Sequence, residues 1–202
     1  MSALLFHQGR INIPNLLTLM RILLIPLLVA AFYLPYHWSH IAAGVLFALA
    51  AITDWFDGYL ARRLGQMTPF GAFLDPVADK LIVVVALVLL VESYTNIWIT
   101  LAASIIIARE VAVSALREWM AELGKRASIA VSYLGKIKTC LQMLAITGLL
   151  ALRPDMTQSL TLMMCTVLMV SAVLTLWSMI IYLKIAWPLF KLDLHQSPSA
   201  HD

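Results

Sequence analysis

Residues 54–79 read D-W-F-D-G-Y-L-A-R-R-L-G-Q-M-T-P-F-G-A-F-L-D-P-V-A-D, and this stretch decides how the whole chain is interpreted. It sets four carboxylates within two long apolar runs, those of Asp54, Asp57, Asp75 and Asp79. An aspartate at the centre of a membrane costs about 2.5–3.5 kcal/mol even on the scale derived from insertion experiments. Four such residues close together therefore need a common partner.

The composition around this stretch is that of a membrane protein. Of the 202 residues, 62% are hydrophobic and 12% are charged, whereas a soluble domain is about 45–50% apolar and about 25% charged. A single soluble core cannot bury this surplus, so lipid must be the solvent for much of the surface. A span needs about 20 apolar residues, which leaves room for about six. The net charge of +3 is modest, and we expect no nucleic-acid partner.

Short polar breaks divide the chain into six apolar runs, and we predict an all-α bundle of six transmembrane helices. The predicted spans are residues 15–34, 40–61, 71–92, 97–120, 127–151 and 158–185. They form one domain over residues 14–188, between an interfacial helix over residues 1–13 and a disordered tail over residues 189–202. Lys and Arg gather at both termini and in the second-to-third and fourth-to-fifth connections. The positive-inside rule therefore predicts that both termini are cytoplasmic.

The spacing of the four carboxylates predicts that they meet. Asp54 and Asp57 share one helix face, as do Asp75 and Asp79. The short connection makes the second and third spans antiparallel neighbours, so the acids lie together about 6–12 Å below the cytoplasmic surface at 1.5 Å per residue. Oxygen-only ligands suit Mg²⁺, Mn²⁺ or Ca²⁺. Two such ions would balance the charge, and two-metal sites serve phosphoryl displacement.

Small and basic residues accompany the acids. Gly58, Ala61 and Gly71 keep the two helices thin beside the carboxylates. Close helix packing explains small residues in membrane proteins, and so does the approach of a ligand to the backbone. Arg62, at the end of the acidic helix, is either a topological anchor or a guanidinium that binds a diphosphate. Both alternatives stay open for each of these residues.

A second group of charged residues is cationic. Its members are Arg109, Arg117, Lys136 and Lys138. Arg109 lies too deep in its predicted span to be a simple anchor. Internal ion pairs with Glu110 and Glu118 would explain the arginines structurally. We favour a pocket for an anionic, phosphate-bearing substrate, because an arginine at this depth is otherwise a costly choice.

Residues 54–79 also resemble a known signature, that of the CDP-alcohol phosphotransferases. The pattern is D-x-x-D-G-x-x-A-R, eight residues, then G-x-x-x-D-x-x-x-D, and every fixed position is present. Two flanking segments, P-N-L-L-T at residues 14–18 and R-E-W-M-A-E-L-G-K-R at residues 117–126, are similar to the bacterial members that make phosphatidylglycerol phosphate. The resemblance covers nearly the whole chain.

The resemblance implies an active site open to the cytoplasm and a homodimer in the bacterial inner membrane. Three of the aspartates, Asp54, Asp57 and Asp75, would hold Mg²⁺ or Mn²⁺, and Asp79 would join them while acting as the general base. The CDP-lipid would be held by Asn15, Thr18, Gly58, Ala61, Arg62, Thr68 and Gly71. The phosphate of the acceptor would be held by Arg109, Arg117 and Lys136, with Lys138 as a further candidate.

The implied reaction is phosphatidyl transfer from CDP-diacylglycerol to sn-glycerol 3-phosphate. It gives phosphatidylglycerol phosphate and CMP, and is the committed step of phosphatidylglycerol and cardiolipin synthesis. Within the family, an inositol phosphate, serine or a second lipid could replace glycerol phosphate as the acceptor. From other classes, a divalent-cation transporter or a metal-stabilised scaffold would also need membrane carboxylates. The apolar outer halves of the second and third spans disfavour a transporter, and a scaffold leaves the cationic group unexplained.

Overall fold

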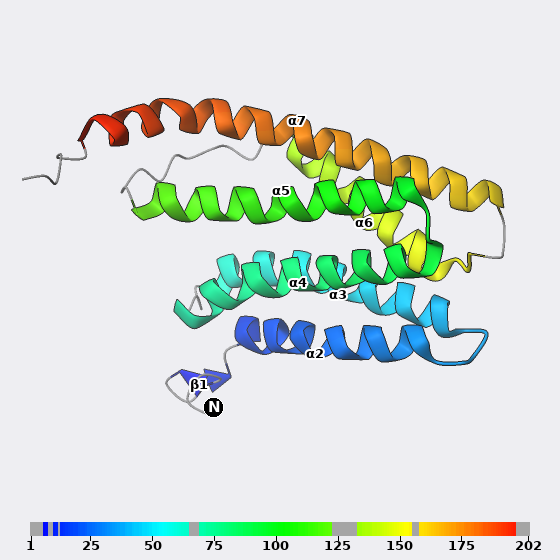
Figure 1. Ribbon diagram of the computed structural model, residues 1–202. Helices are drawn as coiled ribbons and strands as arrows, with labels where there is room; N and C mark the ends of the chain where they lie inside the picture. The colour runs from blue at the N-terminus through cyan, green and yellow to red at the C-terminus, as the bar shows by residue number, and fades with distance from the viewer. Residues whose placement is uncertain are drawn as a thin grey trace, which may run out of the picture.

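The computed structural model describes residues 6–7, 10–11, 13–64, 69–122, 133–154 and 158–196, which fold mainly as a bundle of six α-helices (Figure 1). The helices are α2 (Ile13–Tyr33), α3 (Ser39–Leu64), α4 (Pro69–Tyr94), α5 (Ile97–Glu122), α6 (Tyr133–Ala151) and α7 (Gln158–Gln196). They confirm the six predicted helices. The fifth predicted span began at residue 127, and its residues 127–132 lie outside the described part.

The two ends of the chain differ from the prediction. Phe6–His7 (β1) pairs antiparallel with Arg10–Ile11 (β2), so the helix predicted for residues 1–13 is wrong for these residues. Helix α7 continues to Gln196, so the disordered tail predicted from residue 189 is wrong as far as residue 196. The sequence L-F-K-L-D-L-H-Q contains no glycine or proline that would end a helix.

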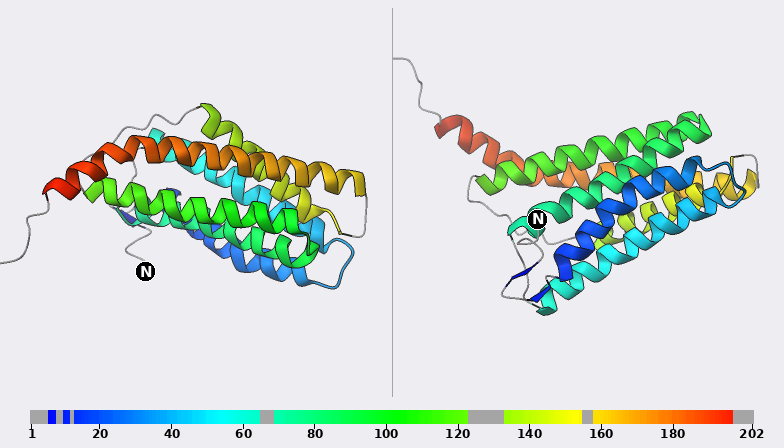
Figure 2. Two further views of the ribbon diagram at one scale, coloured as in Figure 1. Left: turned by 45° about the horizontal axis from the view of Figure 1, so that its top comes forward. Right: turned by 90° about the horizontal axis from the view of Figure 1, so that it is seen from below.

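The helices run roughly along one axis, and β1 and the last turn of α7 lie at the same end of the bundle (Figures 1 and 2). We call this the terminal end; the α2–α3, α4–α5 and α6–α7 connections lie at the opposite end. Helix α2 packs against both α3 and α4, while α6 packs against α3 and α7, and α5 against α7 and α4. Among the described residues, α3 and α4 contact each other much less than each contacts α2. Helix α2 is therefore the main link between the two acidic helices.

The surface of the bundle is apolar, as the composition predicts. Two helical stretches, Ile97–Met120 and Gln158–Lys184, are long and apolar enough to cross a membrane, and three further apolar stretches are shorter. Large apolar side chains are exposed along the helices, among them Leu23, Val88 and Val173. Such a surface suits lipid better than water.

Close packing and hydrogen bonds hold the opposite end. A Cβ on Gly44 of α3 would lie 2.7 Å from Cβ of Ala151 on α6, so only glycine fits this helix crossing. Tyr94 donates its hydroxyl to the carbonyl oxygens of Leu149 and Leu152, at 2.9 and 3.1 Å, and so satisfies the end of α6. Asn96 accepts a 2.9 Å hydrogen bond from the Trp98 amide and caps α5.

Candidate active site

A buried arginine joins the two halves of the acidic stretch. Arg21 lies on α2, and its guanidinium forms an ion pair with Asp79 of α4 and a second one, at 3.4 Å, with Asp54 of α3. Asp54 and Asp79 are each ten residues from the terminal end of their helices, at Leu64 and Pro69. They therefore lie at matching depth, about 15 Å along the helix axis at 1.5 Å per residue. These two carboxylates therefore contact the same guanidinium.

The three side chains differ sharply in exposure. The Arg21 side chain is 1% exposed, whereas those of Asp54 and Asp79 are 46% and 36% exposed. The apolar side chains of Phe47 and Ile82 line a cavity of about 20 Å³ beside them, room for about one water molecule. The guanidinium thus contacts the carboxylates from the buried side, and their other side is accessible.

Other predicted ligands lie on the same helices. Asp57 follows Asp54 by nearly one turn of α3, and Asp75 precedes Asp79 by one turn of α4, both toward the terminal end. Their side chains lie outside the described part of the structure, and among the described residues no group of three metal-ligating side chains occurs. The fourfold cluster therefore stays a prediction.

The predicted CDP-lipid ligands fall mostly outside the described side chains. These are Asn15, Gly58, Ala61, Arg62 and Gly71, whose backbones are helical, and Thr68, which lies in an undescribed segment. Thr18 is described and buried, at 1% exposure, inside the bundle. It precedes Arg21 by three residues on α2, so both side chains are on the same helix face.

Sequence reasoning missed Arg21. It interrupts an apolar run eight residues into α2, and an arginine at such a depth is costly without a partner. The same argument had singled out Arg109. The same cost argument, applied to the first span, indicates that Arg21 needs an acidic partner.

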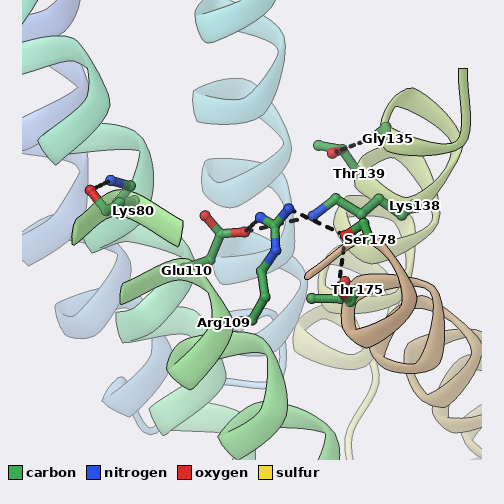
Figure 3. A network of polar contacts seen from close by, with 9 residues as sticks. Lys80, Arg109, Glu110, Gly135, Lys138, Thr139, Thr175 and Ser178 are labelled. Carbon is green, nitrogen blue, oxygen red and sulfur yellow. Dashed lines mark hydrogen bonds and ion pairs between the residues drawn. The ribbon is translucent and has the colours of Figure 1, made fainter. Parts of the chain in front are cut away.

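A second polar network lies between α5, α6 and α7 (Figure 3). Arg109 donates a 2.7 Å hydrogen bond to the Glu110 carboxylate, and Nζ of Lys138 lies 3.8 Å from the same oxygen. The pairing of Arg109 with Glu110 is the structural alternative raised for this arginine. However, two cations share one carboxylate, so the three side chains keep a formal charge of 2 − 1 = +1.

Helix α7 completes this network. A second Arg109 nitrogen donates to Oγ of Ser178 at 3.3 Å, and the Tyr182 ring lies 5.8 Å from the guanidinium carbon. Within the described residues, Nε of Arg109 and Oγ1 of Thr175 are buried without a hydrogen-bond partner. Buried polar atoms are seldom left in this state unless water or a ligand completes them. These α7 side chains carry no strong signal in the sequence, because single Ser, Thr and Tyr residues in an apolar helix are ordinary.

The other predicted members of the cationic group, Arg117 and Lys136, belong to α5 and α6 but have side chains outside the described part. A contact between α4 and α5 lies near both networks. Lys80, the neighbour of Asp79, donates to Oγ of Ser114 on α5, which is one turn from Glu110. The acidic and the cationic network therefore lie at adjacent levels of the bundle.

A larger cavity, of about 590 Å³, lies at the opposite end of the bundle between the first turns of α5 and α7. Its lining includes Asn96, Trp98, Gln158 and Thr161 and carries no charged side chain among the described residues. It therefore lacks the groups that bind a metal ion or a phosphate. The candidate site is the pair of networks nearer the terminal end.

A helical bundle with paired carboxylates beside a buried cationic network has the groups needed to bind metal ions and phosphates together. The family model for CDP-alcohol phosphatidyltransferases matches residues 11–187, and the chain belongs to this family. This membership favours an enzyme over the transporter and scaffold alternatives.

Curated relatives are similar over nearly the full length. A Pseudomonas fluorescens protein named CDP-diacylglycerol--glycerol-3-phosphate 3-phosphatidyltransferase is 58% identical over 90% of this chain and 93% of its own length. Proteins of the same name from Salmonella choleraesuis and Yersinia pestis are 57% and 56% identical, over 87% and 88% of this chain and 94% and 96% of their own lengths.

Proposed function

We propose that this chain transfers the phosphatidyl group of CDP-diacylglycerol to sn-glycerol 3-phosphate, giving phosphatidylglycerol phosphate and CMP. The names of relatives more than half identical to it support this reaction. The structural observation that carries the proposal is the convergence of Asp54 and Asp79 on Arg21, which joins the two halves of the family's acidic signature.

The carboxylates fit Mg²⁺ or Mn²⁺. The donor set is oxygen only, which suits these hard ions, and the described carboxylates are accessible on the side away from Arg21. The residues that would hold two ions are Asp54, Asp57, Asp75 and Asp79. When bound, such ions polarise the phosphorus and stabilise the CMP leaving group.

Asp79 would act as the general base. It would take the proton from the attacking glycerol hydroxyl as the new oxygen–phosphorus bond forms and the bond to CMP breaks. Arg21 contacts Oδ1 of Asp79, which fixes the orientation of the carboxylate. A carboxylate beside a guanidinium is a weak base, so much of the rate must come from positioning.

The cationic network would bind the phosphate of the acceptor. Arg109 and Lys138 share the Glu110 carboxylate, and the three side chains sum to a formal charge of +1, to which Arg117 and Lys136 would add. The CDP-lipid would lie along the terminal halves of α2, α3 and α4, held by Asn15, Thr18, Gly58, Ala61, Arg62, Thr68 and Gly71.

We further propose six membrane spans with both termini in the cytoplasm, a homodimer, and an active site facing the cytoplasm from the inner membrane. The described part of the chain contains six helices, with β1 and the last turn of α7 at one end of the bundle, which supports this topology (Figure 1). Arg62 and Arg63, in the last turn of α3, lie at the same end, as the positive-inside rule expects of a cytoplasmic end.

The test is an acceptor assay on purified protein. CDP-diacylglycerol is supplied in mixed micelles with Mg²⁺ and each of glycerol 3-phosphate, inositol phosphate, serine and phosphatidylglycerol, and the release of CMP is measured. We expect release with glycerol 3-phosphate, loss of release with EDTA, and recovery with Mg²⁺ or Mn²⁺. Release with another acceptor and none with glycerol 3-phosphate would overturn the substrate assignment.

A further inference from the structure

Arg21 lies outside the acidic stretch in sequence but contacts two of its carboxylates in the structure. Its side chain is 1% exposed, and it reaches from α2 to one carboxylate on each of the acidic helices. Burying a guanidinium is costly, and a buried ion pair often adds no net stability over apolar packing. The position of Arg21 in the family's acidic site calls for an explanation beyond stability.

The formal charges of Arg21 and the aspartates suggest a role in metal binding. Asp54 and Asp79 with Arg21 carry a formal charge of −2 + 1 = −1. If Asp57 and Asp75 join them, the charge is −3 instead of the −4 of the aspartates alone. Two divalent ions would then leave an excess of +1, which an anionic diphosphate can balance. Without the guanidinium, two ions would leave the site neutral.

We infer that Arg21 is the built-in counter-cation of the metal site: it positions Asp54 and Asp79 and weakens the binding of divalent ions there. This inference rests on the proposed metal site. The guanidinium is a permanent positive charge within contact distance of two of the ligands, and like charges at such range repel strongly in a partly buried site. Arg21 therefore keeps metal affinity low, and the diphosphate of the substrate contributes to ion binding.

The direction in which metal affinity changes when Arg21 is replaced distinguishes the counter-cation role from a structural role. Arg21→Gln keeps amide hydrogen-bond donors but removes the charge, so metal binding should become tighter. A residue that only maintained the fold would weaken metal binding when replaced. Arg21→Lys keeps the charge and is the matched control.

The experiment measures Mn²⁺ binding by electron paramagnetic resonance on the purified full-length protein in detergent, without substrate. We expect Arg21→Gln to lower the Mn²⁺ Kd at least tenfold, which corresponds to about 1.4 kcal/mol, and Arg21→Lys to stay within about threefold of the wild type. In EDTA, Arg21→Gln should also unfold at a lower temperature, because nothing then offsets the repulsion between the carboxylates. Saturating Mn²⁺ should reverse this loss.

The outcomes that contradict the inference are distinct. Unchanged or weaker Mn²⁺ binding by Arg21→Gln, with normal binding by the wild type, would overturn the counter-cation role alone. Absence of Mn²⁺ binding by the wild type would overturn the proposed metal site and this inference with it. If Arg21→Gln does not survive purification in EDTA, it is purified with Mg²⁺, and the Mn²⁺ affinity is measured by competition.

Discussion

Replacing Arg109 by alanine tests whether the cationic network binds the acceptor. The Arg109 side chain is 7% exposed and donates to Glu110 and Ser178, and its Nε has no partner among the described residues. A hydrogen bond to a charged group contributes about 1.5–3 kcal/mol. Loss of this interaction with the acceptor phosphate should therefore raise the KM for glycerol 3-phosphate about 10- to 100-fold.

The cost to stability should be smaller than for a lone buried charge. After the Arg109→Ala substitution, Glu110 keeps Lys138 at 3.8 Å, and its side chain is 26% exposed. The usual penalty for breaking a buried pair is about 3–5 kcal/mol, so we expect about 2 kcal/mol here. The variant should remain folded in the membrane, and its kinetics can be measured.

The assay follows CMP release while one substrate is varied at saturating levels of the other. The KM for CDP-diacylglycerol should change less than threefold. Ser178→Ala is the matched control, because it removes the 3.3 Å hydrogen bond to Arg109 without removing charge, and the KM for glycerol 3-phosphate should then rise only slightly. Equal changes in both KM values for Arg109→Ala, or no change in either, would refute the acceptor assignment.

Three further predictions concern the base and the packing. Asp79→Asn should lower kcat by at least about 100-fold while the protein still purifies as a folded species; near-normal turnover would contradict the base assignment. Tyr94→Phe should lower the free energy of unfolding by about 1–2 kcal/mol and leave both KM values unchanged, which thermal unfolding and CMP release together would check. Gly44→Ala should lower the free energy of unfolding by about 1–3 kcal/mol, because its Cβ would lie 2.7 Å from Cβ of Ala151. Gly148→Ala is the control and should lower it less, because its Cβ would contact only the flexible side chain of Met164. Equal losses of stability in the two variants would contradict this interpretation of the α3–α6 crossing.

The helices were predictable from sequence because the apolar runs are long and the breaks between them short. Among the described residues, six helices lie where six runs were predicted, since long apolar runs between short breaks favour helices. The ends of the chain were not predictable in the same way. Polarity alone was interpreted as disorder after residue 188, but polar side chains do not end a helix, and α7 continues to Gln196.

The pairing of the aspartates on helix faces was predictable from their spacing, but the contact with Arg21 was not. The i, i+3 and i, i+4 spacings identify helix faces within α3 and α4, and Asp54 and Asp79 both contact Arg21. Spacing along two helices says nothing about a third, and Arg21 is far from both in sequence. Packing of α2 against α3 and α4 brings it there, and this depends on the tertiary fold.

The acidic and the cationic network each combine two like charges with one opposite charge. In the first, one cation lies between two carboxylates and leaves −1; in the second, one carboxylate lies between two cations and leaves +1. Each network is partly neutralised, which makes its burial tolerable, because an isolated charge in a low-dielectric interior is far more costly. Each also carries a net formal charge of one unit, summed over its three named side chains. A residual negative charge attracts metal ions and a residual positive charge attracts a phosphate, so the remaining charges match the two kinds of ligand that the proposed reaction must bring together.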